Sequence, residues 1–176
     1  ELYKKRVLTD AGGEMPQREK PSDSLLPIEN IAWNLTHQCN LRCRYCYYAD
    51  SLNDSTNTEL SADEVISFLK TVKPLVSKRA TLTILGGEPL LYPDKLIEVC
   101  RAAKKMRMNP LISTNGTLID DSFSKEAKRI GLEVQVSLDG PNAEMNDPLR
   151  GPGTFERIQK GVMILNERGV HTILSM

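Results

Sequence analysis

Residues 31–46 read IAWNLTHQCNLRCRYC, in which a β-rich run leads directly into three closely spaced cysteines. The apolar and β-favouring side chains of residues 31–36 predict a strand. Cys39, Cys43 and Cys46 follow it in the spacing C-x3-C-x2-C. Thiolates are soft metal ligands, and here they gather where the strand ends. The sequence therefore predicts a metal site at the edge of a sheet, where the strand over residues 31–36 ends.

The tight grouping of the thiols favours metal binding over a disulfide framework. The chain has 176 residues and four cysteines, three of them within one short loop, and such clusters bind metal more often than they cross-link a chain of this size. Three thiolates can ligate three irons of a cubane cluster and leave the fourth iron for a ligand that is not protein. A structural zinc site is the alternative, but it requires four protein ligands and would have to recruit His37. Cys100 lies on the apolar side of an expected helix and is interpreted as a core residue.

Downstream of the cysteines, helical and strand-like patterns alternate. Ser61 to Glu64 reads as a capping box, which predicts the start of a helix that Pro74 kinks or ends. The apolar face of this helix is formed by Val65, Phe68, Leu69, Val72 and Val76. Further strands are expected over residues 81–85, 111–112, 134–138 and 170–174, and helices over residues 94–105, 123–130 and 155–165. Gly169 is expected to end the last helix.

This alternation predicts βαβ units and a parallel sheet. Both a barrel and a doubly wound sheet are compatible with it. A complete eight-unit barrel needs about 250 residues, so residues 30–176 have room for four complete units and a fifth strand. We therefore expect the natural protein to continue beyond Met176.

Composition and charge exclude several classes of function. Lys plus Arg and Asp plus Glu each number 23, so the formal charge is zero and we expect no nucleic-acid or membrane partner. Neither a membrane-spanning apolar run nor a signal peptide is recognisable. Residues 1–29 are polar and rich in glycine and proline, which indicates a leader or linker before one domain over residues 30–176. The free thiols favour a reducing, cytoplasmic setting.

Four further motifs follow the expected strands. Residues 86–89 read Gly-Gly-Glu-Pro, residues 113–116 Ser-Thr-Asn-Gly and residues 137–140 Ser-Leu-Asp-Gly, and Arg150-Gly151 lies in the next loop. Together with the cysteine spacing, this order resembles the radical S-adenosylmethionine (SAM) superfamily over residues 31–176. The resemblance implies an α/β fold, a partial TIM-like (β/α) barrel of parallel strands that is truncated in its fifth strand. In βα barrels the carboxyl ends of the strands carry catalysis, which is where all these motifs fall.

The resemblance implies a [4Fe–4S] cluster on Cys39, Cys43 and Cys46, with SAM bound to the open iron. Reductive cleavage of SAM would give methionine and a 5′-deoxyadenosyl radical that abstracts hydrogen from a substrate. The chain resembles in particular the SPASM-type peptide-modifying maturases and anaerobic sulfatase-maturing enzymes. It would then be an oxidoreductase or peptide-modifying enzyme, with a peptide or protein substrate and an electron donor such as flavodoxin or ferredoxin. Asn146 stands where some relatives have histidine, a departure outside the expected SAM contacts.

The SAM contacts that the resemblance implies are Tyr45, Gly86, Gly87, Glu88, Asn115, Ser137, Asp139 and Arg150. Glycines let a backbone approach a ligand closely, and an arginine offers a planar fork of donors to a carboxylate. Glu88 would add charge complementarity or brace its loop, and Asp139 would bond a ribose hydroxyl or cap its loop. Each contact has a simpler interpretation, such as a tight turn for the glycines or a core aromatic for Tyr45.

A second class of function is a non-catalytic module that binds metal or peptide. It would be either a zinc-binding interaction domain or a degenerate radical-SAM-like binder of peptide. A degenerate member would be expected to have lost cysteines or SAM motifs, whereas this chain keeps them all. Bound zinc would favour the module, and bound iron with sulfide would favour the enzyme.

Overall fold

The computed structural model describes residues 27–53 and 58–176. The first strand begins at Ile28, two residues inside the expected leader, and the leader before residue 27 lies outside the described residues. The described part contains no helix that is long and apolar enough to cross a membrane.

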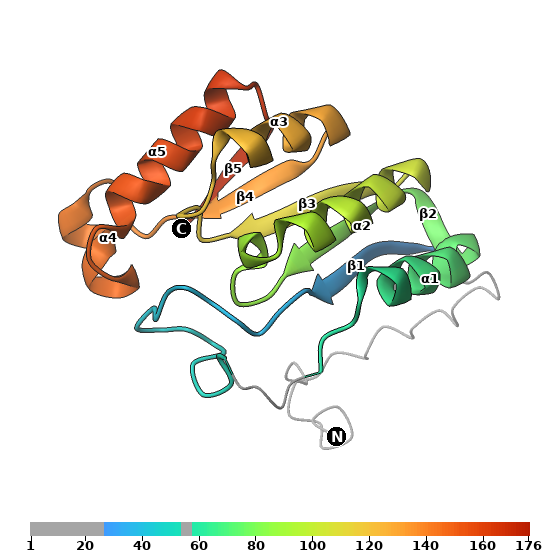
Figure 1. The fold of residues 1–176 in the computed structure, drawn as a ribbon, viewed down its shortest axis with the longest axis horizontal. Coiled ribbons are helices and arrows are strands. Elements are labelled where there is room, and N and C mark those ends of the chain that lie inside the picture. Colours follow the sequence, from blue (N-terminus) through green and yellow to red (C-terminus); the bar gives the residue numbers. More distant parts are fainter. Residues whose placement is uncertain (1–26, 54–57) are drawn as a thin grey trace, which may run out of the picture.

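Five parallel strands form one sheet in the order β1-β2-β3-β4-β5 (Figure 1). The strands are β1 (Ile28–Asn34), β2 (Val76–Leu85), β3 (Asn109–Thr114), β4 (Glu133–Ser137) and β5 (Thr172–Ser175). A doubly wound sheet reverses its strand order at a switch point, whereas here each strand pairs with the next one in the chain. The α/β fold is therefore the partial TIM-like barrel, and the expectation from the resemblance is confirmed.

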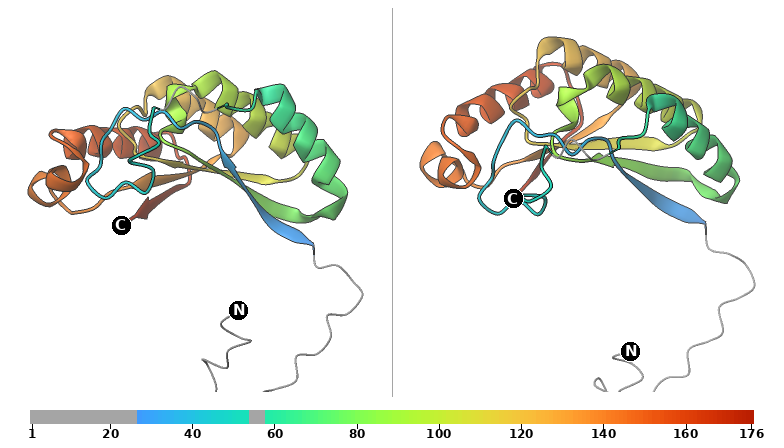
Figure 2. Two further views of the ribbon diagram at one scale, coloured as in Figure 1. Left: turned by 90° about the horizontal axis from the view of Figure 1, so that it is seen from below. Right: turned by 60° about the horizontal axis from the view of Figure 1, so that its bottom comes forward.

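The helices lie on the convex face of the curved sheet, and none of the helices in the described part of the chain covers the concave face (Figure 2). They are α1 (Ala62–Val72), α2 (Pro93–Lys105), α3 (Asp121–Ile130), α4 (Ala143–Arg150) and α5 (Thr154–Glu167), with 3-10 turns η1 (Lys73–Leu75) and η2 (Pro89–Leu91). The core lies between the helices and the sheet, where Leu82, Ile84, Ile112, Val134 and Val136 are fully buried. Each such side chain stabilises the fold by about 1.5–3 kcal/mol.

The alternate residues of the strands face the concave side. We call six of the polar side chains on this face the inner wall: Asn30, Asn34, Thr83, Ser113, Gln135 and Ser137. Their neighbours on the same face include the polar residues Thr81, Asn109, Glu133 and Ser175. Ala32, Leu85 and Leu111 lie between them on the same face. The interior of a filled barrel consists of bulky branched side chains, so these short polar groups indicate a lumen that accepts a polar ligand or water.

Several local predictions are confirmed and three are wrong. Ser61 and Glu64 form the reciprocal capping box, and α1 ends at Val72, just before η1, which contains Pro74. Val76 is the buried first residue of β2 rather than part of the helix, because the helix has already ended. Phe68 is half exposed. Arg150 lies at the end of α4 and not in a loop.

Candidate functional site

The cysteine loop leaves β1 at the carboxyl edge of the sheet and returns toward α1. Its base is closed by Asn53, whose side chain accepts a hydrogen bond from the Cys39 amide at 3.0 Å while its own amide donates to His37 O at 3.0 Å. Asn53 adopts a left-handed backbone with φ 62°. Glu59 closes the base a second time, accepting from the Thr36 hydroxyl and from the His37 amide at 3.2 Å. The cysteines therefore sit on a loop that is tied at its ends.

The three cysteine side chains line one cavity of about 150 Å³ together with residues from the ends of β2, β3 and β4. The lining residues are Cys39, Cys43, Cys46, Leu52, Leu85, Gly86, Gly87, Ser113, Thr114, Asn115, Ser137 and Arg150. Of the expected SAM contacts, five line this cavity: Gly86, Gly87, Asn115, Ser137 and Arg150. Tyr45, Glu88 and Asp139 do not line it.

The two glycines are needed because the cysteine loop packs directly on them. A Cβ at Gly86 would lie 2.4 Å from Thr36 O, and one at Gly87 would lie 2.2 Å from Gln38 O. The Gly87 amide donates to Thr36 O at 2.8 Å, and the next amide, of Glu88, donates to Gln38 O at 2.8 Å. The close approach seen here is thus between two backbone segments.

Glu88 is fully buried behind the cavity wall. Its carboxylate accepts hydrogen bonds from Leu90 N at 2.9 Å, Thr114 Oγ1 at 2.7 Å and Asn115 N at 2.8 Å. Burial raises the pKa of this carboxyl, and the three donors oppose that effect. Glu88 therefore braces the end of β2 against the end of β3.

Asn115 connects the end of β3 to the cysteine loop. Its Nδ2 donates to Asn40 Oδ1 at 2.9 Å and lies 4.0 Å from Cys39 Sγ, while its Oδ1 accepts from the Thr117 amide at 3.0 Å. Asn40 Nδ2 in turn donates to Thr117 Oγ1 at 3.0 Å. These amides hold the Cys39 side of the loop against the sheet.

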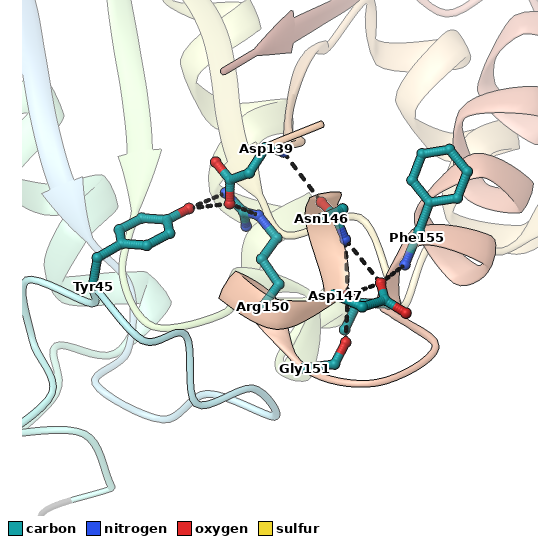
Figure 3. Close-up of polar contacts among 8 residues, drawn as sticks. Tyr45, Asp139, Asn146, Asp147, Arg150, Gly151 and Phe155 are labelled. Carbon is teal, nitrogen blue, oxygen red and sulfur yellow. Dashed lines mark hydrogen bonds and ion pairs between the residues drawn. The ribbon is translucent and has the colours of Figure 1, made fainter. Parts of the chain in front are cut away.

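Arg150, Asp139 and Tyr45 form a closed set of three hydrogen bonds (Figure 3). Arg150 Nε donates to Asp139 Oδ2 at 2.6 Å, Arg150 Nη2 donates to Tyr45 Oη at 2.8 Å, and Tyr45 Oη donates to the same Asp139 oxygen. Partial burial, and then the bond to Asp139, raise the pKa of Tyr45 to about 12, so the phenol keeps its proton. We call this set the Tyr45–Asp139–Arg150 triad.

The triad is anchored to α5 through Asn146 and Asp147 (Figure 3). Asn146 is completely buried; its Oδ1 accepts from the Asp139 amide at 3.1 Å and its Nδ2 donates to Thr154 Oγ1 at 2.9 Å. Asp147 accepts from the amides of Gly153 at 2.7 Å and Phe155 at 2.9 Å and so caps the start of α5. Sequence reasoning missed these supports, as it missed Asn53 and Glu59.

The donor set suits an iron–sulfur cluster. Burial raises the pKa of the Cys39 and Cys43 thiols, and nearby Arg150 opposes this at Cys43. Ligation by metal would deprotonate them. In residues 27–53 and 58–176 no group of three or more His, Cys, Asp or Glu side chains is arranged to hold a metal ion. A cubane takes one thiolate at each of three irons, so its ligands surround a cavity instead of meeting at one point.

His37, the candidate fourth ligand of a zinc site, and Cys100, the expected core residue, lie elsewhere. His37 packs edge-on against Tyr48, with ring centroids 6.0 Å apart, and is not among the residues that line the cavity. Cys100 is fully buried in α2, as predicted, and burial raises its pKa to about 12.

Comparison with known proteins gives a consistent result. Residues 33–176 match the family model of the Radical SAM superfamily. The chain is 37% identical over 139 residues to the AdoMet-dependent heme synthase of Methanosarcina barkeri, covering 78% of this chain and 39% of that protein. It is 32% identical over 154 residues to the cysteine-type anaerobic sulfatase-maturating enzyme of Clostridium perfringens, covering 80% and 41%.

Among solved structures, native anSMEcpe with bound AdoMet and Cp18Cys peptide superimposes with a TM-score of 0.71 at 26% identity, covering 85% of this chain and 42% of that one. The chain thus spans about two fifths of the length of the proteins it matches.

Proposed function

The chain belongs to the radical SAM superfamily, whose enzymes use a [4Fe–4S] cluster and SAM, and on that premise we propose that Cys39, Cys43 and Cys46 hold the cluster. When bound, the cluster and SAM supply the reductive cleavage that yields methionine and a 5′-deoxyadenosyl radical, which abstracts hydrogen from a substrate. The observation that carries this assignment is the single cavity that joins all three thiols to the ends of β2, β3 and β4. Three protein thiolates leave one iron of a cubane for a ligand that is not protein.

The residues around the cavity have chemistry that suits the amino and carboxylate groups of the SAM methionyl moiety. Arg150 offers fork-shaped donors to a carboxylate, and Ser137 offers a hydroxyl from the end of β4. The carbonyls of Gly86 and Gly87 can accept from an amino group. Glu88 contributes by bracing this wall, and Asn115 by holding the cysteine loop.

The proposed substrate is a peptide or protein side chain. The maturing enzyme from C. perfringens and the peptide-bound structure support this class. The inner wall supports it too, since its six side chains are uncharged and both donate and accept hydrogen bonds, as peptide groups do; the carboxylate of Glu133 lies beside them on the same face. An electron donor such as flavodoxin or ferredoxin would supply the reducing electron, and the free thiols suit the reducing cytoplasm.

A tetrapyrrole substrate is the second candidate, favoured by the 37% identity to a heme synthase. Arginine and lysine are the side chains best suited to bind the carboxylates of a porphyrin. Over the paired residues of β1 to β5, the concave face carries neither arginine nor lysine, which is why the peptide is preferred.

The test is anaerobic reconstitution with iron and sulfide, followed by dithionite and SAM, with 5′-deoxyadenosine as the product measured. We expect product from the wild type and none from Cys43→Ala. Bound zinc in place of iron, with no product, would instead establish the non-catalytic module. For the substrate, coproporphyrin III and a tryptic peptide mixture are added separately. Stimulation of SAM cleavage by the peptides supports the proposal, and stimulation by the porphyrin alone overturns the peptide assignment.

A further inference from the structure

Tyr45, one of the aromatic residues of the cysteine loop, has two possible contributions, its ring and its hydroxyl. Tyr45 lies between Cys43 and Cys46, and its side chain is 54% exposed. A side chain this exposed gains little from burial, so what orients it is its contact with the other two triad residues. Its phenol makes hydrogen bonds with Asp139 and Arg150, and the Arg150 guanidinium carbon lies 5.9 Å from the centroid of its ring, a contact that a phenylalanine would keep.

The guanidinium of Arg150 both bonds the other two triad residues and faces the cysteine cavity. Its Nε and Nη2 edge faces the triad, and only Arg150 of the three triad residues lines the cysteine cavity. Arginine has five N–H donors in a rigid plane, so holding one edge fixes the direction of the others. The triad uses two of these donors, and among the described residues this leaves three for a ligand in the cavity that Arg150 lines.

The partners of Arg150 are themselves held. Asp139 is anchored by its amide to fully buried Asn146. Tyr45 is held by the cysteine loop, which is docked on α4 through the Arg44 amide and Leu149 O at 2.8 Å. The triad thus connects the turn that bears two cysteines to the arginine that faces them.

We propose that Tyr45 is a positioning residue whose phenol holds Arg150 in the orientation that binds the SAM carboxylate. This inference rests on the proposed function. It differs from the expectation that Tyr45 contacts SAM itself, because it assigns the role to the hydroxyl, acting through Arg150.

The test is equilibrium binding of radiolabelled SAM to the reconstituted full chain, with SAM cleavage measured in parallel. Tyr45→Phe keeps the ring and removes the hydroxyl. We expect the Kd and KM for SAM to rise about tenfold, with iron content and kcat at saturating SAM unchanged. Tyr47→Phe is the matched control, since Tyr47 is 92% exposed in the same loop, and it should bind SAM as the wild type does.

A Tyr45→Phe variant with wild-type SAM affinity would overturn the inference and return the role to the ring. Combining Tyr45→Phe with Arg150→Lys is the second measurement. If Tyr45 acts through Arg150, adding Tyr45→Phe to the Arg150→Lys variant should change the Kd for SAM by less than twofold. A further tenfold rise in this Kd would show that Tyr45 contacts SAM independently and would overturn the inference. If the wild type takes up a cluster but binds no SAM, the proposed function itself fails, and this inference fails with it.

Discussion

Gly87→Ala tests whether the glycine pair serves the cysteine loop. The new Cβ would lie 2.2 Å from Gln38 O and 2.6 Å from Gln38 C, both backbone atoms, whereas ordinary contact begins at 3.4 Å. The loop must therefore retreat by about 1 Å, since packed interiors leave little slack. The backbone of Gly87 lies outside the left-handed region, so the substitution tests the clash without adding strain of its own.

The expected cost combines overpacking with the weakening of two backbone hydrogen bonds, those from the amides of Gly87 and Glu88. Together these amount to about 2–4 kcal/mol. A displacement of about 1 Å at a reacting site can lower the rate about 100-fold. Unfolding in urea, followed by fluorescence of the single tryptophan, Trp33, measures the first quantity, and 5′-deoxyadenosine formation measures the second.

Gly153→Ala is the matched control. Nothing lies within 4 Å of its Cβ position, but its φ is +68°, so it should cost about 1 kcal/mol of backbone strain and leave SAM cleavage intact. If Gly87→Ala were as stable and as active as the wild type, the packing argument would be refuted.

Three further substitutions probe the supports of the site. Glu88→Gln places an amide among three donors and should cost about 2–4 kcal/mol in urea unfolding, while the exposed Glu98→Gln should cost little; equal effects would contradict the bracing role. Asn53→Ala removes the acceptor of the Cys39 amide and a residue type that tolerates the left-handed backbone. We expect faster limited proteolysis of the cysteine loop, and an unchanged rate of cleavage would count against the closing of the loop by Asn53. Asp147→Asn removes a carboxyl whose pKa is lowered, chiefly by the Phe155 amide. A carboxyl whose pKa is lowered in the folded state stabilises the fold above its unfolded pKa of about 3.9, and this stabilisation is lost as the pH falls. The variant should therefore be less stable than the wild type at pH 7, and its free energy of unfolding should decrease less between pH 7 and about pH 3. If the variant and the wild type lost the same free energy of unfolding between these two pH values, this role would be excluded.

The parts of the fold that depend on local pattern were predictable. Alternating strands and helices, the Ser61 capping box and the stop at Pro74 each follow from neighbouring residues. The barrel was distinguished from the doubly wound sheet only by the motif order, because pairing order depends on contacts between distant strands. The start of β2 at Val76 was missed because an apolar residue one turn after Val72 fits a helix equally well.

The candidate site was predictable where spacing along the chain places residues at strand ends. Four of the eight expected SAM contacts, Gly86, Gly87, Asn115 and Ser137, line the cysteine cavity for that reason, and Arg150 lines it from the end of α4. The partners within the site were not predictable. Tyr45 meets Asp139 across most of the described chain, and the supports provided by Asn53 and Glu59 depend on how one loop returns to its base.

The most direct test of the cluster assignment is iron and sulfide content after anaerobic reconstitution, compared between the wild type and single cysteine variants. Cys39→Ala, Cys43→Ala and Cys46→Ala should each lose about four irons and four sulfides per chain relative to the wild type, whereas Cys100→Ala, altered in the core of α2, should lose none. Retention of the full iron content by any of the three loop variants, or loss of it by Cys100→Ala, would contradict the assignment of the cluster to Cys39, Cys43 and Cys46.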